Sequence, residues 1–206
     1  MNVKIDSSHA GIISLMQASL LVLAGGDSRR MGRPKAWLEV GDTFLLRHVA
    51  DNLASAFSEV MVSFAEPEQL EQPVPYRIVF DRKHSAGPLA GLEAGLLAAH
   101  NDVTFAVACD MPYVTLEVAH MAIAAARRCD AALPRIGGRP EPLCGAYRRS
   151  ALPFITGALN TGRLKAADVA NDLDVTWLEG LDPKLFRSLN SPEDLERFHV
   201  EFASQR

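Results

Sequence analysis

The fold is decided by one stretch near the start of the chain, Ser19-Leu-Leu-Val-Leu-Ala24, which runs into the loop Gly25-Gly-Asp-Ser-Arg-Arg-Met-Gly-Arg-Pro-Lys35. The first part is a continuous apolar run that ends at a pair of glycines. Such a run is typical of a strand buried on both faces of a parallel sheet. We therefore predict a strand from Ser19 to Ala24, followed by a polar loop that continues to Pro34.

Beyond this loop, short β-rich runs alternate with helix-like runs. The predicted strands are Glu59–Phe64, Tyr76–Phe80, Thr104–Cys109, Ala131–Pro134, Leu143–Tyr147 and Val175–Leu178. The predicted helices are about Phe44–Phe57, a helix opened by Pro88, Leu116–Arg128, and a last helix that ends near Phe202. Strands that alternate with helices predict an α/β fold whose parallel sheet is wound by right-handed crossovers.

Length and composition set the class of protein. A chain of 206 residues fits one domain, and we expect an N-terminal extension over residues 1–18 and the domain over residues 19–206. Apolar content of 48% and charged content of 22% are ordinary for a globular protein. The net charge of −4 argues against nucleic-acid or membrane-surface binding, which require a basic face.

Location follows from the N-terminus and the cysteines. The apolar run Ile12–Leu23 is too short and too polar to span a bilayer, and no net positive charge precedes it as in a signal peptide. The three cysteines, Cys109, Cys129 and Cys144, are widely spaced and form no CxxC pair. They predict small buried thiols in a reducing compartment, so we expect a cytoplasmic protein.

Chemically distinctive residues follow three of the first four predicted strands. The first strand ends in Gly25-Gly26, the third in Asp81 and the fourth in Asp110. Ligands of open parallel sheets bind outside the carboxyl ends of the strands. We therefore expect these residues to line one crevice.

The loop after the first strand has the composition of a triphosphate cradle. Its glycines let backbone N–H groups approach an anion, and Arg29, Arg30 and Lys35 add positive charge. It is not a Walker A loop because no Gly-Lys-Ser/Thr occurs, and it is not the GxGxxG of a dehydrogenase. The alternative interpretation is a solvated basic turn.

Two carboxylates complete the predicted crevice. Asp110 at a strand end is a natural Mg²⁺ ligand, since Mg²⁺ takes one or two protein carboxylates together with substrate phosphates. Asp81 could do similar work or bind a ribose or base. The alternatives are a helix cap or surface turn for Asp110 and a solvent-facing turn for Asp81. Gly87 and Gly91 would let the next helix start close to a ligand, or simply pack tightly on the sheet.

Several short motifs occur in a set order between about Leu20 and Phe198. They are Leu23-Ala-Gly-Gly26, Ser28-Arg-Arg-Met-Gly32, Lys35, Asp81, Gly87-Pro-Leu-Ala-Gly91, Cys109-Asp-Met-Pro112, Arg139-Pro-Glu-Pro-Leu143, Tyr147 and Asn190-Ser-Pro-Glu-Asp194. In this order they resemble the molybdenum cofactor guanylyltransferase family, bacterial enzymes that join GMP to molybdopterin. The resemblance implies a single Rossmann-like, three-layer αβα nucleotidyltransferase domain with a mostly parallel central sheet.

The resemblance also implies residue roles. The backbone of Leu23, Ala24, Gly25 and Gly26 would contact the guanine nucleotide, and Asp81 would bind it too. Lys35 and Arg30 would hold the phosphates and act as catalytic groups with Asp110, which would bind both the nucleotide and Mg²⁺. The segment from Arg139 to Tyr147, including Arg139 and Tyr147 themselves, and Asn190 would lie toward the pterin.

The chain departs from the family at two places. A family asparagine that helps bind the nucleotide falls near residues 63–65, where this chain has Ser63 and no asparagine. Ser188 and Ser191 replace an asparagine and a threonine of the family ending. Ser191 can still cap a helix with Pro192 at its first position, and such a cap is the alternative role of the whole Asn190 motif.

The implied reaction is transfer of GMP from GTP to Mo-molybdopterin, which releases pyrophosphate. Handing over a labile cofactor also implies transient contact with molybdopterin-loading proteins or acceptor enzymes.

One alternative is a CTP-dependent sister enzyme, although such proteins tend to have Leu-Ala-Ala-Gly where this chain has Leu23-Ala-Gly-Gly26. A second transfers nucleotides to sugar phosphates but is usually longer. A third is a non-catalytic module that binds and delivers the cofactor.

Overall fold

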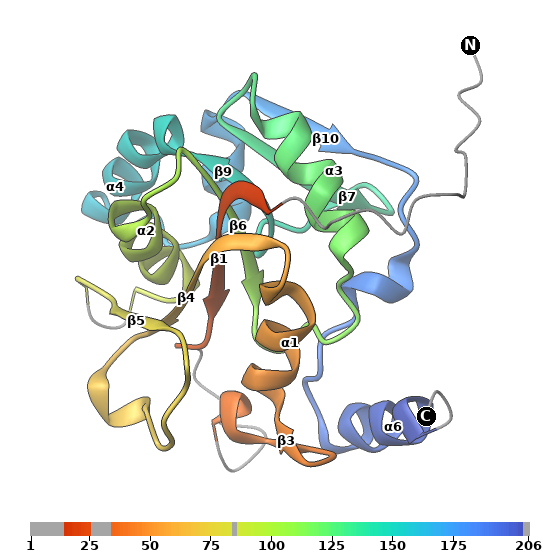
Figure 1. The fold of residues 1–206 in the computed structure, drawn as a ribbon. Helices are drawn as coiled ribbons and strands as arrows, with labels where there is room; N and C mark the ends of the chain where they lie inside the picture. The colour runs from red at the N-terminus through yellow and green to blue at the C-terminus, as the bar shows by residue number, and fades with distance from the viewer. Residues whose placement is uncertain (1–14, 26–33, 84–85, 204–206) are drawn as a thin grey trace.

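A central β-sheet with helices on both faces organises the chain, and the computed structural model describes residues 15–25, 34–83 and 86–203 (Figure 1). The sheet strands are β1 (Met16–Leu23), β4 (Phe57–Phe64), β5 (Arg77–Phe80), β6 (Val103–Ala108), β7 (Ala131–Ile136), β8 (Arg139–Pro140), β9 (Cys144–Arg148) and β10 (Val175–Leu178). A separate hairpin joins β2 (Glu39–Val40) to β3 (Thr43–Phe44). The helices are α1 (Leu45–Ala54), α2 (Pro88–Ala98), α3 (Leu116–Ala126), α4 (Leu152–Asn160), α5 (Ala166–Val169) and α6 (Pro192–Ala203).

The strand order is β10-β7-β9-β6-β1-β4-β5, with β8 paired to β7 beside this path. Along the path, neighbouring strands are parallel except where β9 lies antiparallel between β6 and β7. The hydrophobic β1 is the centre of the parallel part, since it pairs with β4 on one side and β6 on the other. The predicted α/β fold with a mostly parallel sheet is confirmed.

The side chains of β1 show why the molecule has three layers. Leu20 and Val22 belong to the apolar cluster that includes α1 and α3, whereas Leu21 and Leu23 belong to the cluster that includes α2 and α4. Figure 1 shows these helix pairs on opposite sides of the sheet. Because successive side chains of a strand point to opposite faces, an unbroken apolar run such as β1 supplies both cores.

Several element boundaries differ from the predictions. The first strand starts at Met16 rather than Ser19, and α1 ends at Ala54, where the predicted helix continued to Phe57. Phe57 instead opens β4, where it pairs with Met16 and is buried. Sheet pairing therefore overrides the helical pattern at this end. The short hairpin and α4 were not predicted, although Leu152, Ile155 and Leu159 of α4 have the spacing of one helix face.

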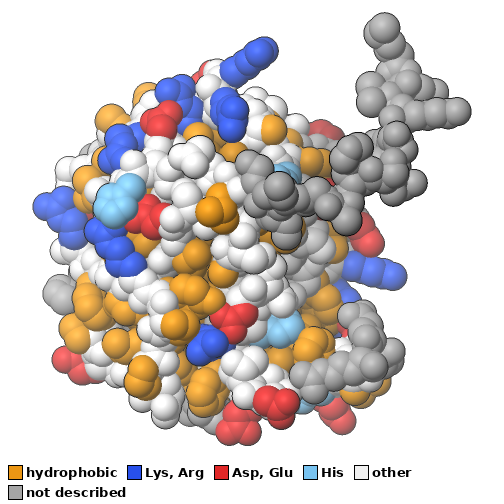
Figure 2. Space-filling view, viewed as in Figure 1, with side chains coloured by type: hydrophobic (Ala, Val, Ile, Leu, Met, Phe, Trp, Pro, Cys, Tyr) orange, Lys and Arg blue, Asp and Glu red, His pale blue; other side chains and the backbone are white. Residues whose placement is uncertain are grey.

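The cysteines and the helix lengths can be compared with the sequence predictions. The three cysteines are buried and free, as the sequence predicts. Among the residues that the structure describes, every helix is too short or too polar to cross a membrane. Figure 2 shows most of the basic side chains of this face at its upper left, with a few acidic ones among them.

Close packing between α2 and the sheet depends on Gly95. A Cβ added to Gly95 would lie 2.2 Å from Cδ2 of Leu21, a side chain with no exposed surface. Such overpacking costs about 1–3 kcal/mol, which exceeds the gain of up to about 1 kcal/mol from replacing a helical glycine with alanine. We therefore expect Gly95→Ala to lower the free energy of unfolding by about 1 kcal/mol or more in urea denaturation.

Gly157 offers a matched control, because it lies in α4 with open space around the position of an added Cβ. Gly157→Ala should raise the free energy of unfolding by up to about 1 kcal/mol. Equal stabilisation by both substitutions would contradict the tight contact between α2 and β1.

Candidate functional site

A cavity of about 600 Å³ opens at the carboxyl ends of the parallel strands. Backbone hydrogen bonds hold these ends in register: Ala24 N donates to Ser63 O, Asp81 N to Phe64 O and Cys109 N to Leu23 O, at 2.8–3.0 Å. The cavity lining includes most of the residues predicted to bind the nucleotide, namely Leu23, Ala24, Gly25, Lys35, Asp81 and Asp110. The strand ends therefore form one crevice, as the sequence predicts. Gly26 and Arg30 lie outside the described residues.

Two glycines allow the backbone to close around this cavity. A Cβ on Gly25 would lie 2.7 Å from the backbone N of Ala65, so β1 and β4 could not end as close together with a larger residue. A Cβ on Gly91 would lie 2.7 Å from Oγ of Ser63. The first turns of α2 can thus pack closely on the strand ends, which agrees with the tight helix–sheet packing predicted from the sequence as one of two roles for Gly91.

Lys35 and Asp110 form the polar centre of the cavity. The ammonium of Lys35 donates hydrogen bonds to Asp110 Oδ2 and to Asn190 Oδ1, each at 2.6 Å. Both members of the ion pair are mostly shielded from solvent, with 19% and 17% of their side chains exposed. Leu189 N also donates to the backbone O of Asp110 at 2.9 Å, which attaches the segment before α6 to the end of β6.

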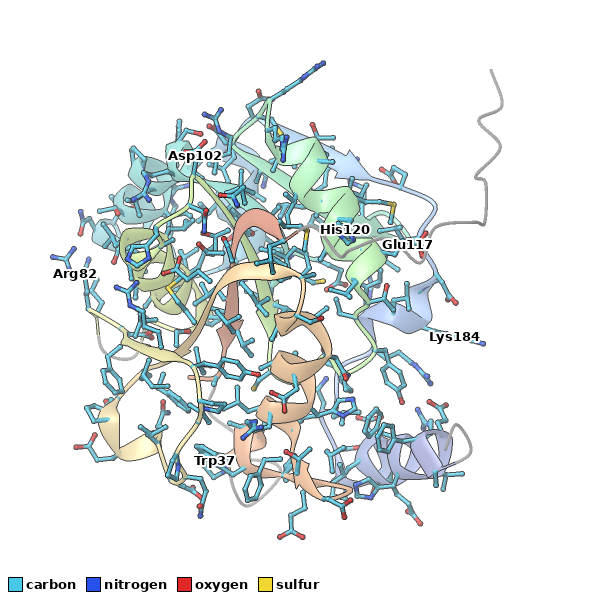
Figure 3. All side chains as sticks on the ribbon, in the orientation of Figure 1. Trp37, Arg82, Asp102, Glu117, His120 and Lys184 are labelled. Atoms are coloured by element: carbon cyan, nitrogen blue, oxygen red, sulfur yellow. The ribbon has the colours of Figure 1, made fainter. Side chains whose placement is uncertain are left out.

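The position of Lys35 follows from its neighbour Trp37. Lys35 begins a 3₁₀ turn whose next two residues are buried, and Trp37 has no exposed surface. The indole stacks on Phe64 of β4 at 6.0 Å between ring centroids, and its Nε1 donates to Gln69 O at 2.7 Å. Figure 3 shows Trp37 beside α1, below the sheet. An aromatic anchor thus holds the turn that presents the lysine.

Cys109 lines the cavity beside Asp110 but is poorly suited to nucleophilic attack. Burial, reinforced by the charge of Asp110, raises the pKa of the Cys109 thiol far above its ordinary value. A thiol acts as a nucleophile through its thiolate, which such burial disfavours. The site therefore suits reactions in which the substrates supply the nucleophile.

The cavity could hold a divalent cation only with help from a substrate. Over the described residues, no three His, Cys, Asp or Glu side chains converge to form a complete metal site. Mg²⁺ usually takes one or two protein carboxylates and completes its shell with water and substrate phosphates. Asp110, facing a cavity with a cation beside it, fits that kind of site.

Arg139, Tyr147 and Asn190, which the family resemblance placed toward the pterin, differ in their position relative to the cavity. Asn190 is held by Lys35, and Arg139 lies exposed on β8 outside the cavity lining. Tyr147 is 2% exposed, and its hydroxyl donates to Pro142 O at 2.6 Å, so it supports the cavity wall from behind.

Sequence reasoning gave no individual role to five residues that line this cavity, namely Glu141, Pro142, Leu143, Leu164 and Lys165. The first three belong to the Arg139–Leu143 motif, which is the signal in the sequence that points to them. The loop that enters β9 reaches the carboxyl edge because β9 runs antiparallel to its neighbours.

Comparison with known proteins identifies the family. The family model described as "MobA-like NTP transferase domain" matches residues 20–174. A protein of Methanosarcina mazei named probable molybdenum cofactor guanylyltransferase is 36% identical, over 86% of this chain and 88% of its own. A protein of the same name from Pelotomaculum thermopropionicum is 32% identical, over 93% and 97% of the two chains.

Solved structures agree with this assignment. Molybdopterin-guanine dinucleotide biosynthesis protein A from Archaeoglobus fulgidus has a TM-score of 0.79 at 26% identity, over 91% of this chain and 100% of its own. A 2-C-methyl-D-erythritol 4-phosphate cytidylyltransferase from Thermus thermophilus, with a TM-score of 0.68 at 20% identity over 89% and 98% of the two chains, shares the fold. The chain therefore belongs to the molybdenum cofactor guanylyltransferase family, within the MobA-like NTP transferases.

Proposed function

We propose that this protein transfers GMP from GTP to Mo-molybdopterin, giving Mo-molybdopterin guanine dinucleotide and pyrophosphate. The observation that carries the proposal is the Lys35–Asp110 pair, 2.6 Å apart in a cavity lined by the ends of β1, β4, β5 and β6. A lysine ammonium can bind the phosphates of a substrate, and a neighbouring carboxylate can bind the metal ion that accompanies them. Family membership supports the choice of guanine and molybdopterin over other substrates.

The nucleotide would occupy the part of the cavity near β1, β4 and β5. There the backbone at Leu23–Gly25 and the side chains of Ser63 and Asp81 line the wall. Ser63, 1% exposed, stands near the place where the family has an asparagine and offers a hydroxyl to the nucleotide. Lys35, together with Arg30 of the neighbouring loop, would neutralise the pyrophosphate as it leaves.

In the reaction, an oxygen of the terminal phosphate of molybdopterin bonds to the α-phosphorus of GTP, and the bond from that phosphorus to the β-phosphate bridging oxygen breaks. Two anions must meet, so the protein needs cations and N–H donors more than an acid–base residue. The attacking phosphate is already ionised near neutral pH. No protein nucleophile is required, consistent with the raised pKa of Cys109.

Asp110 would hold Mg²⁺ in this scheme. The bound ion would supply Lewis-acid chemistry, reducing the charge repulsion between phosphate oxygens. In the structure Asp110 accepts a hydrogen bond from Lys35. Lys35 would place its positive charge beside the phosphates that share the metal with Asp110.

Removing either charge of the central pair should abolish most of the activity. We expect Lys35→Ala to reduce kcat by roughly 10²–10³-fold, the usual effect of deleting a charge-stabilising group. Asp110→Asn should cost at least as much and remove the Mg²⁺ dependence of GTP binding. Glu117→Gln is the control, since Glu117 is an exposed carboxylate on α3 outside the cavity (Figure 3). Near-normal turnover by Asp110→Asn would refute the metal assignment.

Nucleotide binding can be tested without the labile cofactor. At 100 times its dissociation constant, a ligand adds about 2.7 kcal/mol of stability, which in a chain of this size raises Tm by roughly 5–11 °C. We expect GTP with Mg²⁺ to give such a shift in thermal unfolding, and CTP and ATP to give little. A larger shift with CTP would support the cytidylyltransferase alternative. GTP binding without pyrophosphate release in the complete assay would support the non-catalytic module.

A further inference from the structure

The cavity continues beyond Asp110, away from the proposed nucleotide side. In the sheet, β6 is flanked by β1 on one side and by β9 on the other. Ala108 N donates to Leu143 O at 2.8 Å, so the loop entering β9 lies beside the strand end that carries Asp110. In an in-line transfer, the acceptor oxygen approaches the α-phosphorus from the side opposite the leaving pyrophosphate. With the nucleoside on the β1, β4 and β5 side and the pyrophosphate at Lys35, the lining that remains for the acceptor is on the β9 side.

One carboxylate, that of Glu141, lines this second side. Its backbone is held at both ends: Glu141 N donates to Pro134 O at 2.9 Å, and Cys144 N donates to Glu141 O at 3.1 Å. The neighbouring Pro142 is held by the Tyr147 hydroxyl. The side chain is therefore presented from a fixed segment of backbone.

The carboxylate of Glu141 lies in an environment where a hydrogen-bond donor from a ligand would stabilise it. Its half-buried position raises the pKa of the carboxyl above the ordinary value, by loss of hydration alone. Among the described residues, no hydrogen bond or ion pair is found for the carboxylate. A partly dehydrated carboxylate is stabilised by N–H donors and destabilised by nearby phosphates. Glu141 thus suits an uncharged, N–H-bearing end of the acceptor and not its phosphate.

A 2-amino-4-oxopteridine ring has such an end. Its ring N–H and its amino group are adjacent donors that match the two oxygens of a carboxylate, the geometry that makes bidentate pairs strong. The same cavity is also lined by the apolar side chains of Pro142, Leu143 and Leu164, and by Lys165. Leu164 is 40% exposed, so a flat ring against it would cover apolar surface that is otherwise wet.

We propose that Glu141 determines acceptor specificity by accepting two hydrogen bonds from the aminopyrimidinone edge of the pterin, with Pro142, Leu143 and Leu164 against the ring. This inference rests on the proposed function. It also changes the roles expected within the segment that spans residues 139–147. Glu141 takes the place of Arg139 and Tyr147 in contacting the pterin, and Tyr147 positions the wall.

The first test is the transfer reaction of Glu141→Gln. The amide offers one acceptor and sets an NH₂ group against the donors of the ring, so the KM for molybdopterin should rise about tenfold or more. The KM for GTP should stay within about twofold, because the substitution lies on the acceptor side. Glu117→Gln should change neither. Loss of a partly dehydrated charge should not lower the Tm of the protein without ligands.

The second test varies the ligand. It measures a difference between two inhibitors that a purely structural effect of the substitution would leave unchanged. Pterin-6-carboxylate and lumazine-6-carboxylate differ at one position, where the second has an oxygen in place of the amino group. As inhibitors competing with molybdopterin, they should differ by about tenfold or more in Ki with the wild-type protein. They should differ by less than about twofold with Glu141→Gln. Glu141→Asp, which keeps the carboxylate, should retain part of the discrimination.

The outcomes separate this inference from the proposed function. If the wild-type protein transfers GMP but Glu141→Gln leaves the KM for molybdopterin unchanged, the role of Glu141 is wrong while the function stands. A rise in the KM for GTP alone would mean that the carboxylate binds the guanine base, and would likewise overturn the inference. If the wild-type protein neither transfers GMP nor is stabilised by GTP, the function and the inference fail together.

Discussion

The site depends on the backbone hydrogen bonds that hold the ends of four parallel strands in register. Ala24, Asp81 and Cys109 each donate an N–H to a neighbouring strand just where the strands end. The residues that these bonds join are up to 86 positions apart in the chain, as for Cys109 and Leu23. The side chains that follow, above all Asp81 and Asp110, thereby line one cavity. A shift in any of these pairings would separate the carboxylates from Lys35 or turn them to the other face of the sheet.

Much of this arrangement could be predicted because the signals are local. The apolar run of β1 and the residues that follow strands 1, 3 and 4 of the prediction are visible in sequence, and the strand-end rule places them at one edge. Lys35 was predicted to bind phosphate because of its positive charge. Its anchor was not predicted, because the stacking of Trp37 on Phe64 joins residues that no local pattern connects.

The part of the cavity that we propose for the acceptor was predicted less well, for a physical reason. Its position depends on β9 running antiparallel, and strand direction is set by long-range pairing with β6 and β7 rather than by the sequence of β9 itself. The family resemblance pointed to the segment from Arg139 to Tyr147. Only the structure shows that Glu141 faces the cavity, that Tyr147 is buried behind it and that Arg139 lies outside its lining.

The reversed direction of β9 has a consequence for how enzymes of this kind can diversify. A parallel strand contributes only its end to the cavity edge, whereas β9 brings the loop that precedes it, which is joined to the end of β6 by the hydrogen bond from Ala108 N to Leu143 O. Insertions or substitutions in that loop can therefore accumulate while the hydrogen bonds among β1, β4, β5 and β6 stay intact. One half of the molecule can conserve its chemistry while the other half evolves toward new acceptors.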